Sequence, residues 1–315
     1  MRALVTGVSG QDGWYLSAAL RKRGDTVFGL VTSGDDGCPP EVQPVVGDMR
    51  DAASLAAAVE KAEPDEVYNL ASLSSVAQSW REPELVADVN GLGVLRLLVA
   101  VQAFGERTGR VPRFVQASSA EIFGDAPAPQ DERTLIAPTT PYGAAKAFGQ
   151  HVVAAYRAAG AWAASAILYN HESPRRPDTF VTRKITRGVA AIAAGRPERI
   201  ALGNLEARRD WGYAADYADA LVRIAGHSEP RDFVIATGVS SSIADFVRLA
   251  FAHVGIADWE RHVEVDRELQ RPGDAGEQRG DATRARAELG WAPSVDLAGL
   301  VALMVDADRA ELASA

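Results

Sequence analysis

The sequence predicts an α/β protein in which a doubly wound parallel sheet, covered by helices on both faces, is joined to a smaller lobe of mixed α/β structure. Three observations predict this fold class. Short apolar runs alternate with longer segments of helical period, the first apolar run leads directly into a glycine-rich turn, and the alternation loosens after about residue 170. Such alternation is typical of parallel strands joined by right-handed helical crossovers.

Five apolar runs have the length and composition of buried parallel strands. They are RALVT, TVFGLV, EVYNL, RFVQA and ASAIL, at residues 2–6, 26–31, 66–70, 113–117 and 164–168. A further strand is expected to end at Asp48. Segments between these runs carry an apolar stripe at helical spacing, and we expect helices at residues 11–23, 51–62, 82–104 and 142–159.

The second half of the chain has a weaker pattern. Residues 200–213 and 264–281 are rich in charge, glycine and proline, and residues 170–176 (NHESPRR) have no clean period. Helical spacing returns at residues 182–194, 214–225, 243–253 and 297–307. We therefore expect a first domain of residues 1–169, to which residues 212–238 return, and a second lobe of residues 170–211 and 239–315.

The composition excludes several classes of protein. The 315 residues include 42 acidic and 33 basic side chains, a net charge of -9, which disfavours binding to nucleic acids or anionic membranes. The single cysteine, Cys38, cannot form an intrachain disulfide, which fits a reducing cytoplasm. The opening segment MRALVTG lacks the features of a signal peptide, and no apolar run reaches the roughly 20 residues of a membrane span. We expect a cytoplasmic protein whose partners are neither nucleic acids nor membranes.

A glycine turn lies where the first predicted strand meets the first predicted helix. Its sequence, TGVSGQDG, places Gly7, Gly10 and Gly13 three residues apart. Glycines at such a turn let the backbone approach a pyrophosphate, whose charge is met by the N–H groups and dipole of the helix. The first domain is therefore predicted to be a Rossmann-type, dinucleotide-binding domain. Tight backbone packing is the alternative explanation of the glycines.

Residues at the ends of the next two strands bear on the choice of dinucleotide. An acidic residue after the second strand would favour NAD, and an arginine would favour NADP. Thr32 and Ser33 stand there instead. Asp48, after the third strand, could accept a hydrogen bond from an adenine amine, or could instead cap the helix that begins near residue 51.

A tyrosine and a lysine one helical turn apart suggest acid–base chemistry. Tyr142 and Lys146 follow Pro141 at the start of a predicted helix and lie on one face of it. A lysine cation beside a phenol favours the phenolate, which makes the tyrosine a base. Ser119 and Glu121 follow the fifth strand, at the sheet edge where such folds bind ligands, and could bind a sugar hydroxyl and act as a second acid or base. The alternative is turn formation for these two residues and a solvated helix face for the Tyr–Lys pair.

With these motifs, the chain resembles the extended short-chain dehydrogenase/reductases, and among them the GDP-mannose 4,6-dehydratases. The glycine turn and the Tyr–Lys pair are generic to the superfamily, whereas residues 170–187 and 203–217 are far more specific. The resemblance covers nearly the whole chain and is carried by GVSGQDGWYL (7–16), VYNLAS (67–72), QASSAEIFG (116–124), PYGAAK (141–146), NHESPRRPDTFVTRKITR (170–187), GNLEARRDWGYAADY (203–217) and RPGDAGEQRGDATRARAELGWAP (271–293).

The resemblance implies a role for each matching residue. The implied catalytic residues are Ser119, Glu121, Tyr142 and Lys146. The implied cofactor-binding residues are Gly7, Gly10, Gln11, Asp12, Gly13, Thr32, Asp48, Met49, Leu70, Ala71, Tyr142 and Lys146. A nucleotide-sugar would be bound mainly by the second lobe, where arginines suit its diphosphate. The implied residues are Ser75, Asn170, Thr179, Val181, Lys184, Leu202, Gly203, Arg209, Arg271 and Asp274.

Three departures from the family's pattern affect what the resemblance implies. The dehydratases usually carry consecutive arginines where Thr32 and Ser33 stand, and a long loop after them, whereas only about a dozen residues separate the strands here. Residues 73–80 (LSSVAQSW) are more similar to the sister GDP-4-keto-6-deoxymannose reductases, and Asp274 replaces a glutamate. We expect NADP as the cofactor, with NAD as an alternative, and a homodimer rather than the family's tetramer.

The activity implied by the resemblance is that of a nucleotide-sugar 4,6-dehydratase that converts GDP-mannose to GDP-4-keto-6-deoxymannose. It implies oxidation at carbon 4 with Tyr142 as base, loss of water across carbons 5 and 6 with Glu121 as base, and return of the borrowed hydrogen to carbon 6. The sister reductase and an epimerase of another nucleotide-sugar are the alternative enzymes, and a non-catalytic NAD(P)-binding sensor is the alternative of another class. No metal site is predicted, because the histidines lack ligand spacing: His151, His171, His227, His253 and His262.

Overall fold

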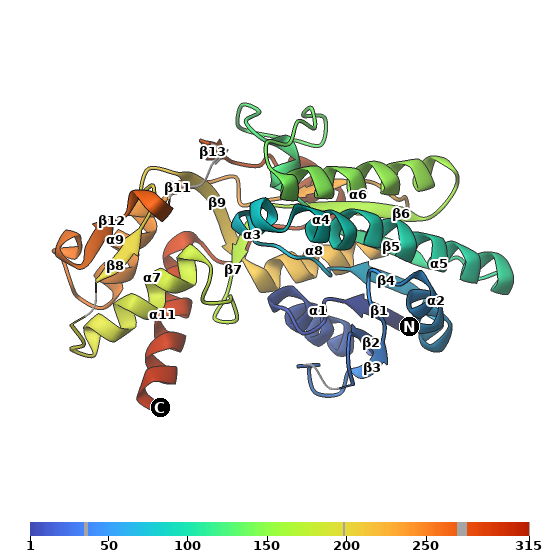
Figure 1. Cartoon of the computed structure of the whole chain (residues 1–315), viewed down its shortest axis with the longest axis horizontal. Helices are drawn as coiled ribbons and strands as arrows, with labels where there is room; N and C mark the ends of the chain where they lie inside the picture. Colours follow the sequence, from blue (N-terminus) through green and yellow to red (C-terminus); the bar gives the residue numbers. More distant parts are fainter. Residues whose placement is uncertain (35–36, 198, 270–275, 315) are drawn as a thin grey trace.

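A seven-stranded parallel sheet forms the larger part of the molecule (Figure 1). The computed structural model describes residues 1–34, 37–197, 199–269 and 276–314. The strands of the sheet are β1 (Arg2–Thr6), β2 (Thr26–Val31), β3 (Gln43–Val46), β4 (Glu66–Asn69), β5 (Arg113–Ser119), β6 (Ala163–Leu168) and β10 (Phe233–Ile235). Their order is β3-β2-β1-β4-β5-β6-β10, with every pair parallel. This doubly wound topology confirms the predicted fold class.

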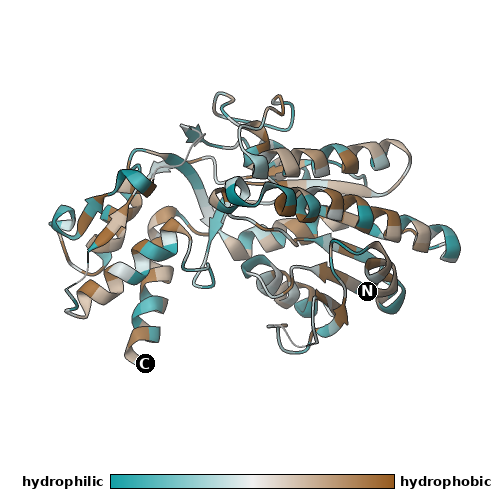
Figure 2. Ribbon diagram, viewed as in Figure 1, coloured by the Kyte–Doolittle hydropathy of each residue, from teal (hydrophilic) through white to brown (hydrophobic). Residues whose placement is uncertain are grey.

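Helices cover both faces of the sheet and enclose two apolar cores. The side chains of β1 show the division, because Ala3 and Val5 join one core and Leu4 joins the other, as alternation along a strand requires. Figure 2 shows hydrophobic and hydrophilic residues side by side on these helices, as expected for amphipathic helices with one face on a sheet. One face carries α1 (Gln11–Lys22) and α8 (Ala214–Gly226); the other carries α2 (Ala52–Ala62), α5 (Gly93–Thr108) and α6 (Pro141–Ala158).

The helix expected at residues 82–104 is a composite of three segments. It comprises α4 (Pro83–Ala87), a π-helical turn η1 (Asp88–Leu92) and α5, which continues to Thr108. At the π turn, the Asn90 side chain accepts a hydrogen bond from the N–H of Leu73 at 2.9 Å and donates one to its carbonyl oxygen at 3.0 Å. These bonds anchor η1 to the chain that follows β4. Single π turns inside helices are frequent at functional sites.

A second lobe, at the left of Figure 1, is built around its own apolar core. Helices α7 (Val181–Ala193), α9 (Ile243–His253) and α11 (Leu297–Ser314) pack together there, close to their predicted bounds except that α11 extends to Ser314. The strands outside the large sheet are β7 (Asn170–Glu172), β8 (Ile200–Leu202), β9 (Arg208–Tyr213), β11 (Ser240–Ser242), β12 (Val263–Val265) and β13 (Glu277–Gln278). Strand β9 pairs with β7, β11 and β13, and β8 pairs with β12.

The short strands of the second lobe were not predicted. Residues 200–213 and 264–281, which are rich in charge, glycine and proline, contain β8, β9, β13 and most of β12. These strands are two to six residues long and pair with distant segments, so no local period marks them. The remaining short helices of the described chain are α3 (Val76–Arg81), η2 (Ala120–Phe123), η3 (Trp259–His262), η4 (Arg267–Leu269) and α10 (Thr283–Leu289).

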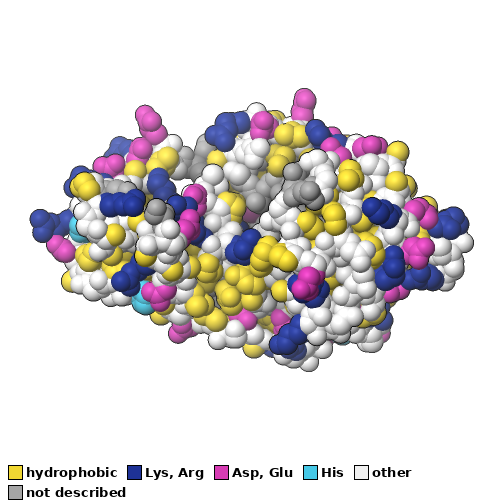
Figure 3. All heavy atoms as spheres, turned by 90° about the horizontal axis from the view of Figure 1, so that it is seen from below, with side chains coloured by type: hydrophobic (Ala, Val, Ile, Leu, Met, Phe, Trp, Pro, Cys, Tyr) yellow, Lys and Arg dark blue, Asp and Glu magenta, His cyan; other side chains and the backbone are white. Residues whose placement is uncertain are grey.

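One face of the molecule carries side chains of both charges. Figure 3 views the molecule from below, and on this face basic and acidic side chains are interspersed rather than gathered by sign. Within the described ranges, no helix is both long and apolar enough to cross a membrane.

Candidate active site

The glycine turn between β1 and α1 has the shape of a phosphate cradle. Gly7 has a φ of 65°, and a Cβ on it would lie 2.8 Å from the backbone nitrogen of Ala71. A Cβ on Gly13 would overlap the carbonyl oxygen of Gly7. The N-cap of α1 is a glycine, Gly10, which has no side chain to occupy the helix N-terminus. The first N–H groups of α1 therefore fit a pyrophosphate at the carboxyl edge of the sheet, and the turn tolerates no side chain at its two ends.

The side chains of Gln11 and Asp12 connect this turn to β7. The Gln11 amide donates to the carbonyl oxygen of His171 at 3.0 Å and accepts from the Ser173 hydroxyl at 2.8 Å. The Asp12 carboxylate lies 2.9 Å from Nε2 of His171, whose ring stacks on Tyr217 with 4.5 Å between centroids. Both implied cofactor residues thus hold the second lobe against the turn. No role was predicted for His171 from the sequence, where its place in the NHESPRR segment was the only available signal.

The Asp12–His171 pair shifts the titration of both groups. Burial opposes ionisation of Asp12, but the charge and hydrogen bond of His171 lower the pKa of the carboxyl to about 2. Burial likewise opposes protonation of His171, but Asp12 raises the pKa of the imidazole above its ordinary value. Both groups are therefore charged at mildly acidic pH, where the pair stabilises the junction.

We expect Asp12→Asn to destabilise the protein more at about pH 5.5 than at about pH 9. The contribution of ionised Asp12 to the free energy of unfolding is complete above the ordinary pKa of 3.8 and is lost as the pH falls toward 2. The contribution of protonated His171 to the free energy of unfolding is complete below the ordinary pKa of 6.5 and is lost as the pH rises through the raised pKa of the folded state. Thermal unfolding at the two pH values measures the difference. Asp51→Asn, at a helix cap where asparagine serves equally well, is the control. An equal loss for Asp12→Asn at both values would contradict the ion pair.

Tyr142 and Lys146 lie together on the buried side of α6. Thr140 caps this helix, accepting a hydrogen bond from the N–H of Gly143 at 3.0 Å, and Pro141 occupies its first position. Tyr142 is 8% exposed and Lys146 5% exposed. The Lys146 ammonium donates to the carbonyl oxygen of Ala117 on β5 at 2.9 Å and lies 5.8 Å from the centroid of the Tyr142 ring. The sheet thus orients the lysine behind the tyrosine.

The titration of this pair differs from the sequence-based expectation. Burial raises the pKa of Tyr142 to about 12; the Ser119 and Ser72 hydroxyls lower it, while the charge of Glu121 raises it. Burial also lowers the pKa of Lys146 to about 8. Burial, rather than the neighbouring lysine, therefore has the largest effect on the pKa of Tyr142 in this structure. The reason is that burial penalises the charged form of both groups.

Ser119 and Glu121 lie at the end of β5, facing Tyr142. The Ser119 hydroxyl accepts a hydrogen bond from the N–H of Glu121 at 3.3 Å, at the start of η2. Gly143 allows η2 and α6 to approach closely, because a Cβ there would overlap the carbonyl oxygen of Glu121. The Glu121 carboxylate accepts a hydrogen bond from the Gln278 amide on β13 at 3.2 Å. The structure therefore brings together all four implied catalytic residues and adds Gln278, which the sequence did not indicate.

The other implied cofactor residues surround the same end of the sheet. The N–H groups of Leu70 and Ala71 donate to the Thr6 hydroxyl at 3.1 and 3.0 Å, and Met49 is buried in a core. Thr32 is exposed after β2.

Asp48 binds a neighbouring cation. Its carboxylate pairs with the Arg50 guanidinium at 2.7 Å, and these hydrogen bonds keep the pKa of the carboxyl below its usual value. Asp51, not Asp48, caps α2, so the alternative role of Asp48 as that cap is wrong.

The implied nucleotide-sugar residues occupy several elements of the second lobe. Val181 and Leu202 pack in its core, whereas Thr179 and Lys184 are exposed near the start of α7. Asn170 pairs with Trp211 in the register of β7 and β9.

Ser75 and Arg209 lie nearer the catalytic edge. Ser75 caps α3, accepting from the N–H of Gln78 at 3.2 Å. Arg209 on β9 is half-buried and is the register partner of Gln278 on β13. Gly203 is half-buried just after β8. Arg271 and Asp274 lie outside the described residues.

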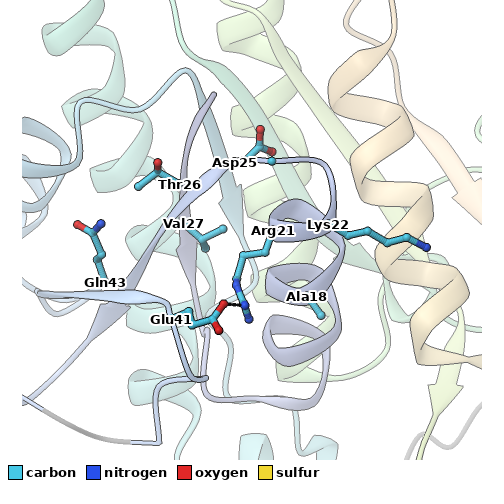
Figure 4. Close-up of a pocket in the computed structure, with 9 residues that line it drawn as sticks. Ala18, Arg21, Lys22, Asp25, Thr26, Val27, Glu41 and Gln43 are labelled. Carbon is cyan, nitrogen blue, oxygen red and sulfur yellow. Dashed lines mark ion pairs between the residues drawn. The ribbon is translucent and has the colours of Figure 1, made fainter.

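One surface hollow is remote from these residues. It has a volume of about 660 Å³ and lies by the amino ends of β2 and β3, beside an Arg21–Glu41 ion pair (Figure 4). Ligands of doubly wound sheets bind at the opposite, carboxyl edge, so this hollow is not part of the candidate site. In the part of the chain that the structure describes, no three His, Cys, Asp or Glu side chains are grouped to hold a metal ion.

The fold and the site together define a class, the extended short-chain dehydrogenase/reductases: a doubly wound dinucleotide domain, a Tyr–Lys pair at its catalytic edge and a second lobe. A sequence model of the family described as GDP-mannose 4,6 dehydratase matches residues 4–304. The chain belongs to that family, which confirms the resemblance seen in its sequence.

Known relatives and solved structures agree with this assignment. The chain is 41% identical to GDP-mannose 4,6 dehydratase 1 of Arabidopsis thaliana, over 97% of this chain and 89% of that protein. It is 39% identical to the human GDP-mannose 4,6 dehydratase, over 97% and 91%. Among solved structures, it is similar to the UDP-glucose 4-epimerase of Thermus thermophilus in complex with NAD, with a TM-score of 0.86 and 26% identity over 98% of this chain and 99% of that one.

Proposed function

We propose that the protein is a nucleotide-sugar 4,6-dehydratase that converts GDP-mannose to GDP-4-keto-6-deoxymannose. The observation that carries this proposal is the meeting of Tyr142, Lys146, Ser119 and Glu121 at one sheet edge, beside the glycine turn. Membership of the GDP-mannose 4,6 dehydratase family supports both the reaction and the substrate. A bare sensor would need the glycine turn but not these four groups, so an enzyme is favoured over it.

Each side chain has a role that its position supports. Tyr142 exchanges the proton of the hydroxyl on carbon 4, next to the Ser119 hydroxyl that lowers its pKa. Lys146, held by β5, orients the tyrosine. Glu121 takes the proton from carbon 5 and returns a proton to the departing hydroxyl of carbon 6, so that water leaves. A nicotinamide dinucleotide held at the glycine turn would supply the hydride chemistry, removal of a hydride from carbon 4 and its return to carbon 6. Carbon 5 regains a proton from solvent, so there is no net redox change.

We propose NADP as the cofactor, with NAD as an alternative. The glycine turn, the glycine N-cap of α1 and the backbone of Leu70 and Ala71 suit the part that both dinucleotides share. Thr32 and Ser33 provide no cation for a 2′-phosphate after β2. Discrimination between the two dinucleotides is therefore expected to be modest.

The proposed activity is tested by incubating the purified protein with GDP-, UDP-, CDP- and dTDP-hexoses. The expected result is a product that has lost one water from GDP-mannose without consumption of added cofactor. An epimerase would leave the mass unchanged, and the sister reductase would consume NADPH. Either of these outcomes would overturn the proposal.

We propose that two copies of the chain form a homodimer through α5 and α6. Three apolar side chains are exposed there: Leu92, the last residue of η1 before α5, is 43% exposed, Val99 on α5 is 50% exposed, and Phe148 on α6 is 41% exposed. Phe148 packs beside Gly91 of η1, so it lies next to the segment that carries Leu92. A two-fold axis would bury the same side chains on both copies.

The dimer is expected to dissociate in Phe148→Glu, because a charge at this position would be buried without a partner. Light scattering measures the mass of each protein in solution. Leu135→Glu, at a residue 78% exposed on another segment, is the control and should remain dimeric. A tetramer for the unaltered protein, or a dimer that survives Phe148→Glu, would contradict the proposed interface.

We propose two further features. Residues 1–169, with 212–238, form the dinucleotide domain, and residues 170–211 and 239–315 form the nucleotide-sugar lobe; the return of α8 and β10 to the large sheet supports this division. We propose the cytoplasm as the location, which suits a chain whose only cysteine is Cys38.

A further inference from the structure

Gln278 is a buried amide in direct contact with the proposed base of the elimination. It is 2% exposed, and its Nε2 donates to Oε1 of Glu121 at 3.2 Å. The two residues lie 157 positions apart in the chain. Gln278 is on β13 of the smaller sheet, and Glu121 is in η2, directly after β5 of the large sheet. An amide that donates to a carboxylate stabilises its ionised form and restricts its orientation.

The backbone around Gln278 is held on both sides. Before it, the carbonyl oxygen of Gly276 accepts from the N–H of Arg208 at 3.3 Å. After it, the Gln130 N–H donates to the Arg279 carbonyl oxygen at 3.0 Å, and the Asp281 N–H donates to the Gln130 carbonyl oxygen at 2.8 Å. The backbone that carries the Gln278 side chain is therefore hydrogen-bonded both to β9 and to the segment around Gln130. Such fixed backbone is what a preorganised site requires.

A buried carboxylate completes this support. Asp210 on β9 is fully buried and accepts hydrogen bonds from the N–H groups of Thr237 and Gly238, both at 2.8 Å, and of Gly280 at 3.3 Å. A Cβ on Gly280 would overlap Ala236, so the chain after β13 packs tightly on the end of the large sheet. This packing leaves β13 little freedom to shift relative to Glu121.

We propose that Gln278 is a positioning residue for Glu121. Its amide holds the carboxylate in the orientation in which it can take the proton from carbon 5 of the sugar. This role rests on the function proposed for Glu121, and it concerns the elimination alone. The oxidation at carbon 4 uses Tyr142 and Lys146, and the Lys146 ammonium is bound to β5 rather than to Gln278.

The register of β13 links this role to the sugar nucleotide. Gln278 is paired with Arg209, and residues paired across neighbouring strands point to the same face of a sheet. Arg209 is one of the residues that the family resemblance implies for the nucleotide-sugar, whose diphosphate an arginine suits. The β9–β13 pair would thus carry both Gln278, which contacts Glu121, and Arg209, which would contact the substrate. This pairing would fix the position of the sugar relative to Glu121.

The test is a single-turnover experiment on the full-length protein loaded with NADP and mixed with GDP-mannose. Absorbance of the reduced cofactor should rise as carbon 4 is oxidised and fall after water is lost. In Gln278→Leu, which keeps the side-chain size but removes the donor, we expect the rise to be nearly unchanged. The fall should be slowed at least about tenfold, because a hydrogen bond to a charged group is lost. Gln278→Glu should slow it further, since two carboxylates would meet.

Gln150→Leu is the matched control. Gln150 is 5% exposed and its amide donates to the Asp232 carboxylate at 2.9 Å, so the same type of bond is removed away from Glu121. Neither phase should change in this variant. Equal slowing of both phases in Gln278→Leu would indicate a structural role only, and an unchanged fall would also overturn the inference. If the unaltered protein did not convert GDP-mannose to a product that has lost one water, the proposed function itself would fail, and this role with it.

Discussion

Tyr142→Phe is expected to lower turnover by roughly 10²–10⁴-fold, the usual effect of removing a general acid–base group, while affinity for the nucleotide-sugar stays nearly unchanged. The ring would still fill its buried place at the start of α6, so the fold and the binding surface should persist. Only the exchangeable proton beside the Ser119 hydroxyl would be lost. Initial rates and calorimetric titration with GDP-mannose measure the two quantities separately.

Tyr156→Phe is the control for this experiment. Tyr156 lies near the other end of the same helix, partly buried against the core that α5 also covers. Its substitution should leave the rate unchanged. If Tyr142→Phe kept more than a tenth of the normal rate, Tyr142 would not be the group that exchanges the proton of carbon 4.

Glu121→Gln is expected to block the elimination to a similar extent, roughly 10²–10⁴-fold. The substitution keeps the size of the side chain, and the new amide oxygen can still accept from Gln278, so the packing around β13 should be retained. What is lost is the base for the proton on carbon 5. The measurement follows deuterium at carbons 4, 5 and 6 of the sugar.

The isotope pattern distinguishes dehydration from reduction. In the unaltered protein, deuterium placed on carbon 4 should reach carbon 6 of the product, and product formed in D₂O should carry one solvent deuterium on carbon 5. Glu121→Gln should form neither labelled product at a significant rate. Stoichiometric consumption of labelled NADPH, with its deuterium on carbon 4 of a 6-deoxy sugar, would instead establish the sister reductase and contradict the proposal.

Much of the first domain was predictable because its signals are local. A strand such as β1 is a run of apolar residues buried on both faces, and α1 begins where Gly10 ends the turn. The Tyr142–Lys146 spacing is also a local property, since residues four apart on a helix share a face. These features need only the sequence within one or two helical turns, so the fold class and the candidate acid–base pair followed from the chain itself.

Tertiary structure decided the features that depend on distant partners. The side chain of Asn90 in the π turn is bound to the backbone of Leu73, which is 17 positions away, and β13 is a strand because β9 lies beside it. Neither the Asp12–His171 pair nor the Gln278–Glu121 bond has a sequence spacing that could reveal it. The pKa of Tyr142 is raised for the same kind of reason: helix spacing places a lysine nearby, but the burial that penalises the phenolate is produced by the packing of η2, β5 and α6 around it.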